Sequence, residues 1–146
     1  MNMRLFKQCV MGVLFLLFAS VAQADQGGNI MLLELKSGIV KIQLREDLAP
    51  KHVERIKQLI SEKFYDGIVF HRVIDGFMAK TGDPTGTGMG GSEYPDLRAE
   101  FSSEPFKRGT LGMARSGHPD SANSQFFICF DDRQLQSKTT IHSNCY

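Results

Sequence analysis

The chain has 146 residues, which is enough for one domain built around a single hydrophobic core. Its formal charge is +1, from 17 basic and 16 acidic residues, so the charge balance excludes strong electrostatic attraction to nucleic acid. Hydrophobic residues make up 42% of the chain, and no internal repeat or low-complexity segment interrupts it, which is typical of a globular protein.

Residues 1–24 have the pattern of a secretory signal peptide. Arg4 and Lys7 make the start basic, a short apolar stretch follows, and Ala22 and Ala24 supply a small-residue cleavage site. A membrane anchor is the alternative, but the stretch is short of the roughly 20 apolar residues that a spanning helix needs. We therefore expect cleavage after Ala24 and no stable membrane insertion of the mature chain.

The three cysteines differ in their surroundings. Cleavage would remove Cys9 and leave Cys129 and Cys145 in an oxidising compartment. Cys129 lies in the apolar run QFFICF and is typical of a buried strand residue, whereas Cys145 lies in a polar tail. The two can form a disulfide, although nothing in their spacing requires one, and we assign neither thiol a function.

The first elements of the mature chain are a hairpin and a helix. Residues 30–44 contain two apolar runs around the turn signal Ser37-Gly38, which predicts a β-hairpin. Residues 49–63 change to a helical period, and Pro50 suits a first helical turn. The predicted apolar face of this helix, which we expect to close one end of the strands, consists of Val53, Ile56, Leu59 and Ile60.

Short strands dominate the rest of the chain. Residues 67–74 are β-branched and aromatic and predict a strand, with residues 77–81 as its partner across a turn. Residues 82–98 are rich in glycine and predict a long loop, and two more strands are predicted at 109–115 and 125–130.

Many short strands with few helices indicate a mainly β protein, built as a closed or nearly closed β-barrel. Residues 131–146 have no convincing apolar period, so this C-terminal tail looks unfinished.

Most familiar catalytic and cofactor motifs are absent from the sequence. GTGMGG fits the dinucleotide-binding glycine pattern, but SEYPDL follows it in place of a helix, so a surface loop is the better interpretation. The four histidines lack the H-E-x-x-H spacing of a zinc site, and no G-x-S-x-G elbow occurs. We expect no metal and no cofactor.

Arg72 is the remaining candidate for chemistry. In an extended strand it shares a face with Phe70 and Ile74, and an arginine among apolar neighbours needs a partner or a task. The alternative is a purely structural ion pair with Glu100 or Asp83.

Three segments, FHRVIDGFMAKTGDPTGTGMGG, GTLGMAR and SANSQFFICF, closely resemble the cyclophilin family of peptidyl-prolyl cis–trans isomerases. The resemblance runs from about residue 30 to residue 130, in the family's order and spacing. It implies an eight-stranded antiparallel β-barrel capped by two helices, with residues 25–130 as the isomerase domain. Because forms with a signal peptide resemble the bacterial periplasmic members, we also expect a periplasmic location.

The resemblance implies a role for each matching residue. Arg72 matches the catalytic arginine, which would stabilise the twisted amide through the prolyl nitrogen. Phe77, Met78 and Phe127 match the apolar surface that holds the proline ring. The other matching substrate contacts are His71, Ile74, Ala114 and Gln125, where Ala114 would offer backbone groups to an extended peptide. Ordinary core packing is the alternative for Phe77, Met78 and Phe127.

Two features depart from the family pattern. Lys80 stands where the family usually has a glutamine that orients the arginine, and a second cation there would repel the guanidinium, so we expect weakened activity. Beyond Phe130 the family's remaining pocket residues, strands and second helix are not recognisable in residues 131–146. A shifted reading frame or an early end would explain this, because IHSN can encode Tyr-Thr-Val in the next frame, where a family-like strand is expected.

The sequence therefore predicts a monomeric prolyl isomerase that acts on X-Pro bonds in extended or unfolded chains and assists the folding of exported proteins. Two alternatives stay open: a non-catalytic peptide-binding or chaperone-like domain, and an inactive truncated product.

Overall fold

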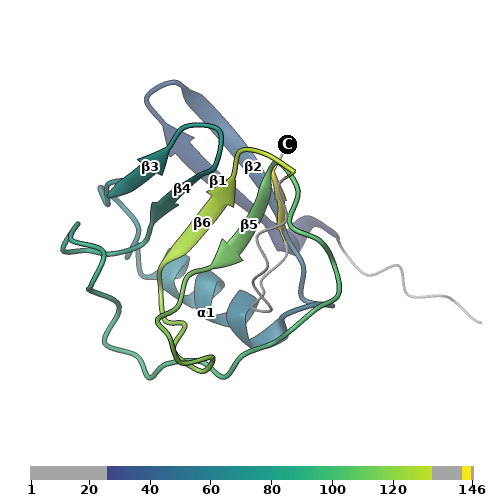
Figure 1. The fold of residues 1–146 in the computed structure, drawn as a ribbon, viewed down its shortest axis with the longest axis vertical. Helices are drawn as coiled ribbons and strands as arrows, with labels where there is room; N and C mark the ends of the chain where they lie inside the picture. The colour runs from purple at the N-terminus through teal and green to yellow at the C-terminus, as the bar shows by residue number, and fades with distance from the viewer. Residues whose placement is uncertain (1–25, 133–142, 146) are drawn as a thin grey trace, which may run out of the picture.

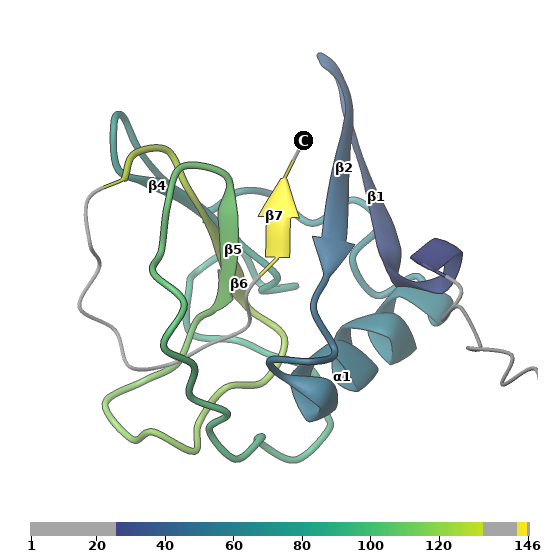
Figure 2. The ribbon, with the colours of Figure 1, turned by 90° about the vertical axis from the view of Figure 1, so that its right-hand side faces the viewer.

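The computed structural model describes residues 26–132 and 143–145. Its strands form one antiparallel sheet in the order β1-β2-β7-β5-β6-β4-β3, and α1 lies across one end of the strands (Figures 1 and 2). The elements are η1 (Gln26–Asn29), β1 (Ile30–Leu35), β2 (Gly38–Leu44), α1 (Pro50–Ser61), β3 (Arg72–Ile74), β4 (Met78–Thr81), β5 (Thr110–Met113), β6 (Phe126–Cys129) and β7 (Ser143–Cys145). The predicted mainly β, antiparallel architecture with a capping helix is confirmed.

The hairpin of β1 and β2 follows the sequence pattern. Leu35 pairs with Gly38 across the turn, as the Ser37-Gly38 signal predicts. Ile42 and Leu44 of β2 are buried, Gln43 between them is half-buried and Lys41 before them is exposed, because successive side chains of a strand point to opposite faces. The buried face of β2 belongs to a core that also contains residues of α1, β5 and β6.

Helix α1 begins at Pro50 and buries His52, Val53, Ile56 and Leu59. The prediction that Ile60 shares this buried face is wrong, because Ile60 is 39% exposed. Neighbouring helical residues point about 100° apart, so Leu59 and Ile60 cannot both face the centre of the core. Ile60 instead lines a cavity of about 820 Å³ between β1 and residues 65–70.

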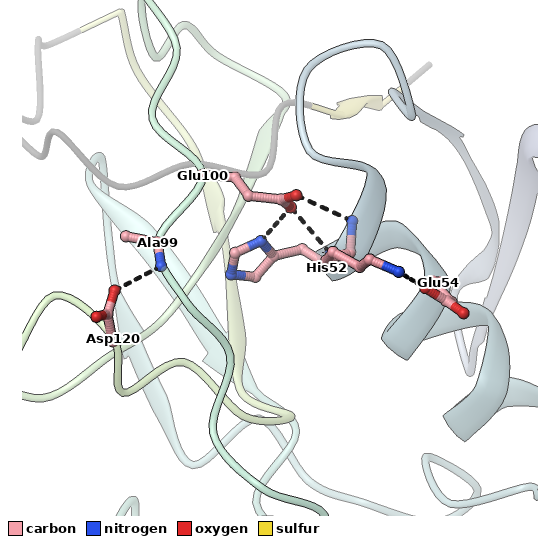
Figure 3. Close-up of polar contacts among 6 residues, drawn as sticks. His52, Glu54, Ala99, Glu100 and Asp120 are labelled. Carbon is pink, nitrogen blue, oxygen red and sulfur yellow. Dashed lines mark hydrogen bonds and ion pairs between the residues drawn. The ribbon is translucent and has the colours of Figure 1, made fainter.

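The N-terminus of α1 is capped by a distant residue. Ala49 precedes the helix and provides no side-chain hydrogen bond. The carboxylate of Glu100 takes this place by accepting hydrogen bonds from the backbone N–H groups of Lys51 and His52, each at 3.1 Å. Nδ1 of His52 lies 2.6 Å from the same carboxylate (Figure 3). The segment around Glu100 is thereby attached to α1.

Strand β3 is shorter than the strand predicted at 67–74, because only Arg72–Ile74 pair with β4. The cause lies in the partner strand, which ends at Thr81. Gly82 has a φ of +89°, and a Cβ there would lie 2.4 Å from the carbonyl oxygen of Ser124. The chain turns away at this glycine, so residues before His71 face no residue of β4 in this register.

The C-terminal tail contributes a strand that its sequence does not predict. Ser143–Cys145 form β7, which pairs with β2 on one side and with β5 on the other. A three-residue strand is too short to show an apolar period, so the pairing depends on the backbone edges of its neighbours.

The predicted signal peptide and residues 133–142 lie outside the described residues. Cys129 is buried in β6, whereas the side chain of Cys145 lies outside the described part, so the structure does not test whether the two pair.

Within residues 26–132 and 143–145, no helix has both the length and the apolar character needed to cross a membrane.

Candidate functional site

One face of the sheet carries a row of residues contributed by four strands. Arg72 of β3 is directly opposite Lys80 of β4, Lys80 is opposite Phe127 of β6, and Phe127 is opposite Gly112 of β5. Directly opposed residues share a face, so this row points away from the core, while Phe126 on the other face of β6 is buried within it. The strand pairing thus brings distant residues together on one surface.

A pocket of about 260 Å³ lies over this row. Phe77 and Phe127 are half-buried in it and Met78 is buried, so the walls are largely apolar. Arg72 is exposed at the same pocket. The lining residues are Arg72, Phe77, Met78, Lys80, Met113, Ala114, Arg115, Ser116 and Phe127. We call this cavity the proline pocket; it unites five of the predicted site residues, namely Arg72, Phe77, Met78, Ala114 and Phe127.

Phe127 is fixed by packing that the sequence did not predict. The ring of Phe106, which is 4% exposed, packs against the ring of Phe127 with centroids 5.5 Å apart. Gly112 makes room for both, since a Cβ there would lie 2.6 Å from Phe106 and 2.7 Å from Phe127. Phe106 lies in the irregular segment before β5, where no periodic pattern could mark it as a supporting residue.

Arg72 has no ion-pair partner among the described residues. The alternative of a structural ion pair is therefore wrong for both candidates. Glu100 binds His52 and the N-terminus of α1, and Asp83 binds the backbone of its own loop. The guanidinium is left at the pocket as a hydrogen-bond donor.

Lys80 lies at the junction of the proline pocket with a second cavity and lines both. Burial lowers the pKa of its ammonium group, the positive charge of Arg72 lowers it further, and Asp83 opposes the change. The electrostatic conflict that the sequence predicts between Lys80 and Arg72 is therefore present in the structure.

The second cavity has a volume of about 390 Å³. Part of its wall is the glycine-rich loop, residues 82–98. Gln125 holds this loop through hydrogen bonds from Nε2 to the carbonyls of Gly88 at 3.1 Å and Gly90 at 2.6 Å. Oε1 of Gln125 is buried and has no hydrogen-bond partner among the described residues. The cavity is lined by Lys80, Gly88, Met89, Gly90, Gly91, Ser92, Asp96, Ala114, Arg115, Ser116, Ser121, Asn123 and Gln125.

Asp83 anchors the same loop and is fully buried. Its carboxylate accepts hydrogen bonds from the backbone N–H groups of Thr85 at 2.8 Å, Gly88 at 2.6 Å and Gly90 at 3.1 Å. Burial alone would raise the pKa of Asp83, but the hydrogen bonds from Thr85 and the loop backbone hold it well below its usual range. The GTGMGG segment is thus a loop, as predicted, with its backbone fastened by a buried carboxylate.

The remaining predicted contacts are placed differently. His71 and Ile74 line neither cavity. The ring of His71 packs beside Gly88, with both nitrogens buried and without a partner among the described residues. Ile74 is 37% exposed and opposite Met78. The backbone N–H of Ala114 already donates to the carbonyl of Gln125 at 2.8 Å, so it is not available to a peptide. Substrate contacts by His71 and Ile74 stay predictions.

Metal-binding residues do not gather in the part of the chain that the structure describes. There, no group of three or more His, Cys, Asp or Glu side chains is arranged to hold an ion.

Known proteins are similar to this chain in sequence or in fold. A probable peptidyl-prolyl cis-trans isomerase of Brucella suis is 57% identical over 122 residues, which cover 76% of this chain and 62% of the relative. A peptidyl-prolyl cis-trans isomerase of Synechococcus elongatus is 42% identical over 100 residues, covering 68% of each chain. The chain thus spans about 62% of the length of the Brucella relatives that it matches.

Among solved structures, a Cryptosporidium parvum cyclophilin type peptidyl-prolyl cis-trans isomerase, crystallised in the presence of the dipeptide Ala-Pro, matches with a TM-score of 0.72. It is 29% identical, and the match covers 76% of this chain and 74% of that one. The family model described as cyclophilin type peptidyl-prolyl cis-trans isomerase/CLD matches residues 30–143, well past the end of the resemblance seen in the sequence. On this match, this chain belongs to the cyclophilin type peptidyl-prolyl cis-trans isomerase family.

Proposed function

We propose that this protein is a peptidyl-prolyl cis–trans isomerase that acts on X-Pro bonds in extended or unfolded polypeptides. One observation carries the proposal: the guanidinium of Arg72 lies at a pocket whose walls include Phe77, Met78 and Phe127. A proline ring is small and apolar, which suits walls of this kind, and the family to which the chain belongs supports the same activity.

The chemistry follows from the electronic structure of the amide. Rotation about a peptide bond has a barrier of about 18–20 kcal/mol, because the C–N bond has partial double-bond character. In the twisted transition state the prolyl nitrogen regains its lone pair and becomes a better hydrogen-bond acceptor. A cationic donor such as Arg72, aimed at that nitrogen, would stabilise the twisted state more than the planar one. No covalent bond is broken and no proton is transferred, so the reaction requires neither a nucleophile nor a metal.

The setting of this activity is part of the proposal. The signal-peptide pattern of residues 1–24 supports export to the periplasm, where slow X-Pro isomerisation limits the folding of newly exported proteins. We propose that the protein acts there as a monomer on exported clients, without a cofactor and without binding nucleic acid.

An isomerisation assay on a short X-Pro peptide tests the function. We expect the purified chain to accelerate the exchange, and Arg72→Ala to lower kcat/KM by about 100-fold, the scale expected when one preorganised donor is lost. Arg98→Ala is the matched control, because Arg98 is exposed and lines neither cavity. An Arg72→Ala variant that is folded and as active as the parent chain would disprove the proposed role.

A second candidate function is supported by Lys80. Its charge opposes that of Arg72 at the pocket, which favours a domain that binds proline peptides without accelerating their isomerisation. Peptide titration separates the two functions, since a binding domain retains affinity for the X-Pro peptide and leaves the exchange rate unchanged. A chain that fails to fold at all would show no cooperative melt in circular dichroism.

A further inference from the structure

Positive charge is concentrated where the proline pocket meets the second cavity. Arg72, Lys80 and Arg115 line the proline pocket, and no Asp or Glu is among its described lining residues. Lys80 and Arg115 also line the second cavity, where Asp96 is the single acidic residue among those described. Asp83 is close in sequence, but its carboxylate is buried under the glycine-rich loop. The junction is therefore cationic.

The two cations on β3 and β4 lack partners in the part of the chain that the structure describes. Within residues 26–132 and 143–145, neither the ammonium of Lys80 nor the guanidinium of Arg72 makes a hydrogen bond or ion pair with another side chain. The two residues are directly opposite on paired strands, where like charges repel. An anion placed beside Lys80 would relieve this repulsion and would be held more strongly than in open solvent, because the site is partly desolvated.

The third cation, Arg115, is restrained by hydrogen bonds to neighbouring backbone carbonyls. Nη1 of Arg115 donates hydrogen bonds to the carbonyls of Ser116 at 2.9 Å and Gly117 at 3.3 Å. These bonds restrain the guanidinium beside the cavity that it lines, so less side-chain entropy is lost when an anion binds there. Asp96 accepts a hydrogen bond from Nδ2 of Asn123 at 3.0 Å and forms no ion pair with Lys80.

The position of a bound carboxylate follows from the shape of the site. The two cavities share Lys80, Ala114, Arg115 and Ser116, so they adjoin. An extended peptide advances by about 3.3 Å per residue, so a chain with its proline in the first cavity would reach the second within a few residues. Its side chain at that point would lie beside Lys80 and Arg115.

We infer that the site selects X-Pro peptides that carry Asp or Glu within about three residues of the proline, with the carboxylate bound between Lys80 and Arg115. This inference rests on the proposed function, because it requires the proline to occupy the first cavity. Lys80 is then a specificity-determining residue that disfavours neutral peptides and favours acidic ones. The substrate class is the set of acidic proline-containing segments of unfolded chains.

Fluorescence anisotropy with four labelled peptides tests the inference on the purified chain. The peptides share one X-Pro core. Two of them carry Glu, one before the proline and one after it, and the other two carry Gln or Lys in place of Glu. We expect at least one Glu peptide to bind about tenfold more tightly than the Gln peptide and the Lys peptide to bind most weakly. The preference should shrink in high salt, since exposed charges are screened.

Variants assign the preference to particular residues. Lys80→Gln should bring the ratio of Glu to Gln affinity close to one, and Arg115→Gln should reduce it in part. Lys41→Gln is the control, because Lys41 is exposed on β2 and lines neither cavity, and it should retain the full ratio.

Equal affinity for the Glu and Gln peptides would overturn the inference, as would a preference that survives Lys80→Gln. A folded chain that binds none of the four peptides would overturn both the inference and the proposed function. Acidic preference without acceleration of isomerisation would overturn the proposed activity and leave the inference standing, because binding is measured without catalysis.

Discussion

Nδ1 of His52 lies 2.6 Å from the carboxylate of Glu100, although 48 residues separate the two in the sequence. The same carboxylate accepts hydrogen bonds from the first backbone N–H groups of α1. One acidic side chain therefore caps the helix and fixes the long loop segment against the helix. Ala99, the neighbour of Glu100, donates its backbone N–H to Asp120 at 2.8 Å (Figure 3). The helix, the loop and the turn before β6 are thereby connected.

Removing this carboxylate should destabilise the fold. We expect Glu100→Ala to lower the free energy of unfolding by about 2–4 kcal/mol, because a helix cap is lost and the ring nitrogen of a buried histidine loses its partner. Urea denaturation measures the change. Glu54→Ala, which removes an exposed ion pair with Lys51, should cost no more than about 0.5 kcal/mol. Equal losses from the two variants would contradict the assigned role of Glu100.

The Glu100 contribution should also depend on pH. Burial alone would raise the pKa of Glu100, but hydrogen bonds from His52 and the helix backbone lower it below the ordinary value of 4.5. A carboxyl whose pKa is lowered on folding stabilises the protein above its ordinary pKa and loses that contribution as the pH falls through the folded value. We expect the parent chain to lose more stability between pH 5 and pH 3 than Glu100→Gln does, as followed by urea midpoints. Parallel pH profiles would exclude this linkage.

Gly112 should be intolerant of even one methyl group. A Cβ there would lie 2.6 Å from Phe106 and 2.7 Å from Phe127, so Gly112→Ala must displace a wall of the proline pocket. We expect a stability loss of about 1–3 kcal/mol, the usual cost of overpacking, together with weaker peptide binding. Gly117→Ala is the control, since no atom lies within 4 Å of its added Cβ. Unchanged peptide affinity in a folded Gly112→Ala variant would show that Phe127 does not shape the pocket.

Lys80→Gln should raise the isomerisation rate on a neutral peptide. The amide oxygen of glutamine can accept a hydrogen bond from the Arg72 guanidinium, whereas the ammonium of lysine cannot and repels it. Lys80→Met separates the two effects, because it removes the charge without supplying an acceptor. The peptide assay should rank Gln above Met and Met above Lys. No gain in rate with glutamine would refute the prediction that Lys80 weakens activity.

Asp83→Asn should loosen the glycine-rich loop. The carboxylate binds three backbone N–H groups, and an amide in its place has one acceptor oxygen and an NH₂ group facing other donors. We expect faster hydrogen exchange at Gly88 and Gly90. Asp75→Asn, in the exposed turn between β3 and β4, should leave both rates unchanged. Unaltered exchange in Asp83→Asn would mean that other contacts hold the loop.

Particular residues show how far the sequence could predict the site. Phe77, Met78 and Phe127 were predicted as pocket walls and Arg72 as the residue beside them, and the structure brings all four to one cavity. The matching motifs are local, and the alternation of strand side chains carries each residue to the correct face. Phe106 could not be predicted, because it reaches the site from an irregular segment that has no period. Arg115 ends the predicted strand 109–115 but follows β5 in the structure, and the sequence assigned it no role.

The sequence by itself determined the local elements: the hairpin through Ser37-Gly38, the start of α1 at Pro50, and the strands that carry the pocket residues. These follow from turn chemistry, helix start signals and hydrophobic period, which act within a few residues. Only the tertiary structure decided that Glu100 caps α1, that Gly82 shortens β3, and that Ser143–Cys145 join the sheet. Those outcomes depend on hydrogen bonds and close contacts between distant segments, and no local pattern encodes which distant partner will be near.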